Sequence, residues 1–117
     1  MFEQFFDGAS RVRGLRDSSG GPFLEKFAEQ LFQAGYAEIT ARRHIRAAEH
    51  LIYWSGCEGI PISSLTEELV ERFDEHLNGC QCPRYGRTHR LELLNGVRLF
   101  LRCLRSADGT ATAIDQT

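Results

Sequence analysis

The stretch from Gly35 to Ser55 constrains the fold most, because its pattern predicts one long helix with two unlike faces. At 100° per residue, a helix over Thr40 to Trp54 gathers small and aliphatic side chains on one side: Ala41, Ile45, Ala48, Leu51 and Ile52. The other side carries Arg42, Arg46 and Tyr53, with Arg43 and His50 beside them. Gly35 can end a preceding helix, and Thr40 is a good N-cap. We expect the aliphatic side to be buried and the arginine side to stay free.

Three further segments have the periodicity of amphipathic helices, and short loops rich in Gly and Pro separate them. They span about Pro22 to Ala34, Glu67 to Leu77 and His89 to Ser106. Four helical segments joined by short loops predict an all-α four-helix bundle with no sheet. The expected core contains Phe23, Phe27, Leu31, Ile45, Ile52, Phe73, Val97, Phe100 and Leu104.

Both ends of the chain lack this periodicity. In residues 1–21, Arg11, Arg13 and Arg16 alternate with small residues before an SSGG run, which is typical of a flexible arm. Residues 107–117 are small and polar, as in a linker or tail. We therefore expect one helical domain over residues 22–106, with flexible segments on either side.

The formal net charge is −2, but the charges are segregated along the sequence. Six arginines against one acid give +5 between Arg84 and Arg105, whereas five acids against one arginine give −4 between Leu65 and Leu77. A basic surface is therefore compatible with a slightly acidic chain. No apolar run approaches the roughly 20 residues of a membrane span, and no signal peptide is visible. We expect a cytoplasmic protein without a membrane partner.

Arginines also form a stripe on the last predicted helix. Arg98, Arg102 and Arg105 fall on one side of it, and Arg87 extends the stripe if the helix starts early. Without interleaved acids, such a stripe lacks the ion pairs that commonly stabilise a solvated face, and it suits contact with phosphate. A plain solvated face is the alternative, for this stripe and for Arg42, Arg43 and Arg46.

A cluster of potential zinc ligands lies in the loop before that helix: His76, Cys80, Cys82 and His89. Four nitrogen and sulfur ligands can surround Zn²⁺ tetrahedrally. The Cys-x-Cys spacing is tighter than the usual Cys-x-x-Cys, however. Two reduced thiols, with His76 at the C-terminus of the third helix, are the simpler interpretation. We therefore expect no metal and no cofactor.

The Gly35-Tyr36 pair, Thr40, the basic residues after it, the aromatic end of that helix and the HLNGCQCP segment form a combined pattern. It resembles the N-terminal core-binding domain of tyrosine recombinases of the phage-integrase type, from about Pro22 to Ser106. The resemblance implies a SAM-like module that grips duplex DNA at a recombination site, together with other recombinase protomers. The arginine faces and the start of the long helix provide the candidates for these DNA contacts: Thr40, Arg42, Arg43, Arg46, Tyr53, Arg87, Arg98, Arg102 and Arg105.

In that family the tyrosine nucleophile and its arginine and histidine partners belong to a separate C-terminal domain, for which 117 residues leave no room. Tyr36 and Tyr53 match positions of the DNA-binding module, and Tyr85 lies in a loop. We therefore expect a binding domain and not an enzyme, as an excised domain or a truncated gene product. The alternatives are a helical protein–protein interaction module and a small structural domain stabilised by zinc.

Overall fold

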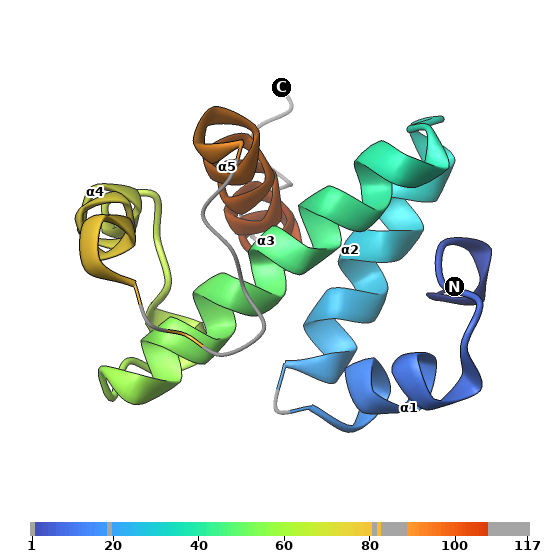
Figure 1. Cartoon of the computed structure of the whole chain (residues 1–117), viewed down its shortest axis with the longest axis horizontal. Helices are drawn as coiled ribbons and strands as arrows, with labels where there is room; N and C mark the ends of the chain where they lie inside the picture. Colours follow the sequence, from blue (N-terminus) through green and yellow to red (C-terminus); the bar gives the residue numbers. More distant parts are fainter. Residues whose placement is uncertain (1, 19, 81, 83–88, 108–117) are drawn as a thin grey trace.

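The computed structural model describes residues 2–18, 20–80, 82 and 89–107, and these residues form helices and connecting turns without a strand. Its α-helices are α1 (Ala9–Asp17), α2 (Gly21–Gln33), α3 (Glu38–Cys57), α4 (Leu69–His76) and α5 (Arg90–Ala107). Short 3₁₀ turns lie at η1 (Phe2–Gln4), η2 (Ile62–Ser64) and η3 (Leu77–Gly79). The predicted all-α class is confirmed. The four predicted helices correspond to α2 to α5, and α1 is additional (Figure 1).

The helix α3 is the longest, with 20 residues, and it crosses the whole molecule (Figure 1). It starts earlier than predicted, since its N-cap is Ala37 and Thr40 lies inside its first turn. The expectation that Thr40 caps this helix is therefore wrong. Glu38 occupies the first turn, where the helix dipole favours a carboxylate, and the side chain of Ala37 provides no capping hydrogen bond.

The turn before α3 is as the sequence predicts. Gly35 has a φ of +82°, a conformation that glycine adopts without a steric penalty. Its N–H donates to the carbonyl of Phe32, and the N–H of Tyr36 donates to the carbonyl of Leu31. These two bonds form a Schellman motif, which satisfies the last carbonyls of α2 and turns the chain into α3.

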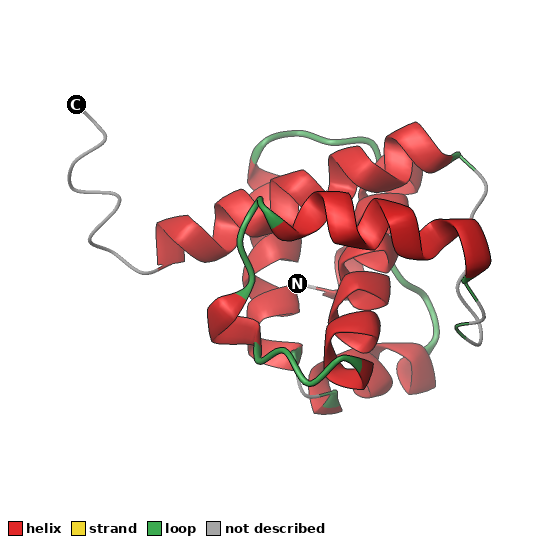
Figure 2. Ribbon diagram, turned by 90° about the vertical axis from the view of Figure 1, so that its left-hand side faces the viewer, coloured by secondary structure: helices red, strands yellow, loops and turns green. Residues whose placement is uncertain are grey.

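The helices α3 and α5 pack closely and cross instead of lying alongside each other (Figures 1 and 2). The two helices approach closely at Gly96. A Cβ on that residue would lie 2.9 Å from Nδ1 of His44 and 3.0 Å from Cβ of Ala47. Because residue 96 has no side chain and residue 47 has only a methyl group, the two backbones can approach this far.

The hydrophobic core lies between α2, α3 and α5. The rings of Phe27 and Phe100 meet edge to face at 5.3 Å, which joins α2 to α5. Among the residues predicted to be buried, Phe27, Leu31, Ile45, Ile52, Phe73, Val97 and Phe100 are buried. Two predictions are wrong, because Phe23 is 39% exposed and Leu104 is only half-buried. Leu24 takes the core position at the start of α2, one residue after Phe23.

The interpretation of residues 1–21 as a flexible arm is wrong for residues 2–18. These residues form η1 and α1, which both pack on α2. Their apolar side chains are buried: Phe2, Phe5, Phe6, Val12 and Leu15. Arg16 adds ion pairs to Glu3 at 2.8 Å and to Glu25 at 3.0 Å. The physical reason is that this segment carries enough apolar surface to complete the core beside α2.

The predicted C-terminal tail lies outside the described residues beyond Ala107, where α5 ends. Within the part of the chain that the structure describes, every helix is too short or too polar to cross a bilayer.

Replacing Phe2 by alanine tests whether the N-terminal segment belongs to the core. Because Phe2 is fully buried, we expect the free energy of unfolding to fall by about 3 kcal/mol in urea denaturation. The control is Leu91→Ala on α5, where the side chain is 81% exposed and the change should stay within about 0.5 kcal/mol. Equal, small effects of both substitutions would support a flexible arm.

Two glycine substitutions with opposite expected effects on stability test the crossing of α3 and α5. Gly96→Ala forces the helices apart and should destabilise the fold by about 1–3 kcal/mol. Gly14 lies inside α1, where an added methyl group would meet nothing within 4 Å, so Gly14→Ala should stabilise the fold by about 0.5–1 kcal/mol. Thermal unfolding by circular dichroism measures both, and a stabilising Gly96→Ala would contradict the close crossing.

Candidate nucleic-acid interface and histidine–cysteine cluster

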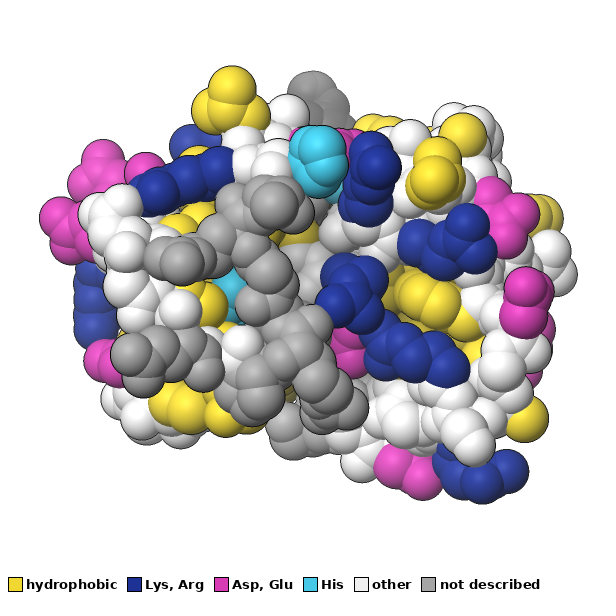
Figure 3. Space-filling model, in the orientation of Figure 1, with side chains coloured by type: hydrophobic (Ala, Val, Ile, Leu, Met, Phe, Trp, Pro, Cys, Tyr) yellow, Lys and Arg dark blue, Asp and Glu magenta, His cyan; other side chains and the backbone are white. Residues whose placement is uncertain are grey.

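The arginine side of α3 faces outward, as predicted. Arg43, Arg46 and Tyr53 are exposed and Arg42 is half-exposed, whereas the aliphatic side of the helix is buried. Thr40, in the first turn, is half-buried. On the face drawn in Figure 3, basic side chains gather over the region that α3 crosses. This outer face of α3, defined by Arg42, Arg43, Arg46 and Tyr53, is the α3 arginine face.

Carboxylates pair with part of this face. Arg42 contacts Glu38 at 3.2 Å, and Arg43 contacts Glu92 of α5 at 3.3 Å. All four side chains are at least 30% exposed, so each pair contributes only about 0–1 kcal/mol. These guanidinium groups can therefore exchange a carboxylate for another anion at little cost.

Sequence reasoning missed one basic residue beside this face. Arg11 of α1 donates to both carboxylate oxygens of Glu49, at 3.1 and 2.5 Å. The helix α3 carries two acids, Glu38 and Glu49, and only 11% of the Glu49 side chain is exposed. Arg11 thereby neutralises it. The periodicity of the sequence does not reveal this ion pair, because residues 11 and 49 are far apart in sequence.

The arginine stripe of α5 differs from its prediction. Arg98, Arg102 and Arg105 are exposed, but Glu67 pairs with Arg102 at 3.7 Å and with Arg105 at 3.0 Å. The expectation that this stripe lacks ion pairs is therefore wrong for Arg102 and Arg105. Among the residues that the structure describes, Arg98 has no carboxylate partner. Arg87 lies outside the described residues.

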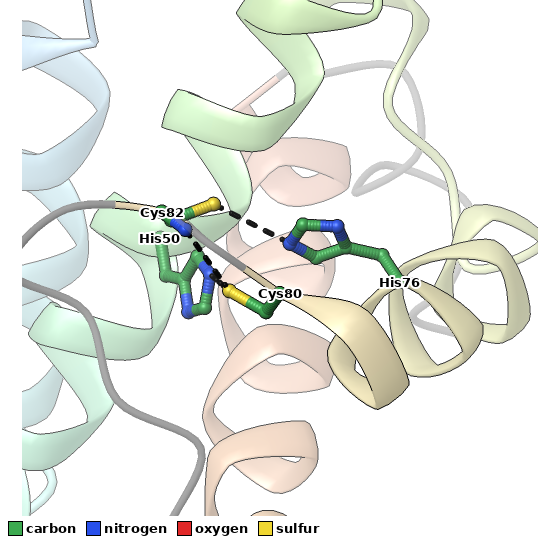
Figure 4. A group of neighbouring side chains, drawn as sticks. All are labelled: His50, His76, Cys80 and Cys82. Atoms are coloured by element: carbon green, nitrogen blue, oxygen red, sulfur yellow. Dashed lines mark hydrogen bonds between the residues drawn. The ribbon is translucent and has the colours of Figure 1, made fainter.

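Four potential metal ligands meet where the segment after α4 crosses α3 (Figure 4). They are His50 of α3, His76 of α4, and Cys80 and Cys82. One ligand atom of each lies within 4.8 Å of the others. Nε2 of His50 is 3.4 Å from Sγ of Cys80, and Nε2 of His76 is 3.4 Å from Sγ of Cys82. We call these four residues the His–Cys cluster.

The composition of this cluster differs from the set singled out in the sequence. His50 takes the place of His89, which is exposed just before α5, with a φ of +56°. The helical period puts His50 beside the arginine side of α3, but only 1% of this residue is exposed. Trp54 lies one turn later and is also buried. A large aromatic residue at this position is the sequence feature that indicates that this side of α3 is covered.

Burial determines the protonation of the cluster at neutral pH. It lowers the pKa of His50 to about 4, with smaller contributions from His76 and from Arg46. Burial also lowers the pKa of His76 and raises that of the Cys82 thiol to about 12. Both imidazoles are therefore neutral, with a lone pair available, and this thiol carries a proton.

No family model, curated protein or solved structure matches this chain.

Replacing Arg11 by alanine should destabilise the fold by about 1–2 kcal/mol, because it leaves the mostly buried carboxylate of Glu49 without its guanidinium partner. Adding Glu49→Gln to the same chain should recover part of this loss, since it removes the unpaired charge. Arg98→Ala is the control, with a change within about 0.5 kcal/mol. Urea denaturation of the wild type, Arg11→Ala, Glu49→Gln and the double variant forms a double-mutant cycle, with Arg98→Ala as a fifth, control protein. No recovery in the double variant would contradict the role of Glu49.

Proposed function

We propose that this chain is a DNA-binding module that holds duplex DNA on its α3 arginine face. The observation that carries the proposal is the outward display of Arg42, Arg43 and Arg46 on one long helix, with Tyr53 two turns after Arg46. Guanidinium groups bind phosphate oxygens in a bidentate manner, and a tyrosine hydroxyl adds a neutral phosphate contact.

The carboxylates on this surface are compatible with such a role. The pairs of Arg42 with Glu38 and of Arg43 with Glu92 are exposed and weak, so a DNA phosphate can compete for each arginine. Glu49 is neutralised by Arg11 from α1. The local charge presented to DNA is therefore positive despite the net charge of −2.

The resemblance to the core-binding domain of tyrosine recombinases supports a more specific role. In this proposal the module clamps a recombination site for DNA integration, alongside other recombinase protomers, and the catalytic residues belong to a domain outside this chain. Thr40 and Arg98 add phosphate contacts on α3 and α5. Arg102 and Arg105 contribute less, because both are paired with Glu67.

Binding of a duplex should depend strongly on salt. If three or four arginines neutralise phosphates, log affinity should fall with log salt concentration at a slope of about −3 to −4. The variant Arg43→Ala/Arg46→Ala should reduce this slope by about two, and Arg98→Ala/Arg102→Ala by about one. Fluorescence anisotropy of a labelled duplex between about 50 and 200 mM salt measures all three.

The two double variants remove the same charge, so the difference between their salt slopes shows which helix face contacts DNA. Lys26→Ala on α2 controls for a loss of charge elsewhere. Circular dichroism checks that each variant stays folded. A slope that no variant changes, or no binding at low salt, would contradict a DNA-binding role for these faces.

A helical interaction module is the second candidate, and one observation favours it. The half-exposed ring of Phe23 borders a hollow between α2, α5 and the segment before α4, with apolar walls that include Ile62 and Leu101. Sedimentation equilibrium without DNA distinguishes the two candidates. Association that depends on protein concentration and is lost in Phe23→Ser would favour the interaction module.

A further inference from the structure

We propose that the His–Cys cluster binds one Zn²⁺ ion through Nε2 of His50, Nε2 of His76 and the sulfur atoms of Cys80 and Cys82. The site is independent of the proposed function in DNA binding. It replaces the expectation from the sequence that the two cysteines are reduced thiols in a loop.

The geometry of the cluster suits a tetrahedral ion. Bonds of about 2.0–2.1 Å from Zn²⁺ to nitrogen and 2.3 Å to sulfur place the ligand atoms about 3.3–3.8 Å apart. Two nitrogen–sulfur pairs of the cluster already lie at 3.4 Å, and the four ligand atoms all lie within 4.8 Å of one another. Small rotations of the side chains are therefore enough to close the site around an ion.

The chemistry of the donors selects zinc over magnesium and calcium. Imidazole nitrogen and thiolate sulfur are borderline and soft ligands, and a tetrahedral set of two each is typical of Zn²⁺. On binding, the two thiols release their protons to solvent. The two thiolate charges then cancel the charge of the ion, which leaves a neutral centre.

A neutral centre fits the surroundings of this cluster. The ring of His50 meets the ring of Phe73 at 5.0 Å, and the ring of His76 lies 5.7 Å from that of Trp54. His50 is buried, and no carboxylate belongs to the cluster among the residues that the structure describes. An uncompensated charge would be costly against these aromatic walls, whereas a neutral Zn(His)₂(Cys)₂ centre is not.

The four ligands come from three parts of the chain, which indicates a structural role. His50 lies in the middle of α3, His76 is the last residue of α4, and the cysteines follow η3 (Figure 4). Four protein ligands leave no open position for a substrate. The ion would join the end of α4 and the segment after it to α3. Its binding energy would thus stabilise the fold.

Metal analysis of the purified chain provides the first test. We expect about one zinc per chain, and a loss of most of it in Cys82→Ser and in His50→Gln. The matched controls are Cys57→Ser and His89→Gln, because both residues are exposed and lie outside the cluster. Both controls should keep their zinc. Zinc well below one equivalent in the wild type, or zinc retained by Cys82→Ser, would overturn the proposal.

A chelator provides the second test, since a ligand variant that fails to fold would lose its metal for another reason. Removal of zinc from the wild type should lower Tm by about 10 °C or more, and added Zn²⁺ should restore it. His89→Gln should show the same shift as the wild type. No shift on chelation would overturn a structural role of the ion.

Cobalt identifies the ligands in the wild type without any substitution. Co²⁺ added to the chelated protein should give the intense visible bands of a tetrahedral site and a thiolate charge-transfer band in the near ultraviolet. Trp54 is the single tryptophan of the chain and lies beside His76, so its fluorescence should be quenched over the same titration. Weak octahedral bands, or no charge-transfer band, would overturn the assignment of the sulfur ligands.

Discussion

The close crossing of α3 and α5 is the contact on which the other elements depend. Gly96 and Ala47 present almost no side chain at the crossing, so the two backbones approach closely. His44 of α3 packs directly against Gly96. Once α5 is held in this position, Phe100 meets Phe27 of α2. The first turn of α5 also reaches α4, where Arg90 pairs with Asp74 at 2.7 Å. A larger residue at position 96 would disturb all of these contacts together.

Three sides of the helix α3 have different surroundings. One side packs into the core through Ile45 and Leu51, and the opposite side displays the α3 arginine face. Between them, His50 and Trp54 meet the end of α4 and the cysteine segment. Because a rigid helix fixes the relative position of its sides, a metal ion at His50 would be held directly beside the arginine face. Burial lowers the pKa of His50, and Arg46, one turn earlier, adds a smaller contribution.

The N-terminal segment shows where local pattern and tertiary packing diverge. Its alternating arginines and glycines are typical of a flexible arm, but Phe2 and Leu15 are fully buried. Arg11 and Arg16 are engaged by acids from α3 and α2, respectively. Apolar residues in a short helix cannot form a core by themselves. They become buried only when a larger unit presents a complementary surface, and composition alone does not reveal that surface.

The sequence by itself determined the all-α class, the order of α2 to α5, the glycine turn at Gly35 and the outward side of Arg42, Arg43 and Arg46. All of these depend on local periodicity and on the conformational freedom of glycine, which short windows of sequence report. Only the tertiary structure decided that Glu67 meets Arg102 and Arg105, and that His50 meets Cys80 in place of His89. The physical reason is that such partners are distant in sequence. Their meeting depends on how whole helices pack, and a helical period carries no information about that.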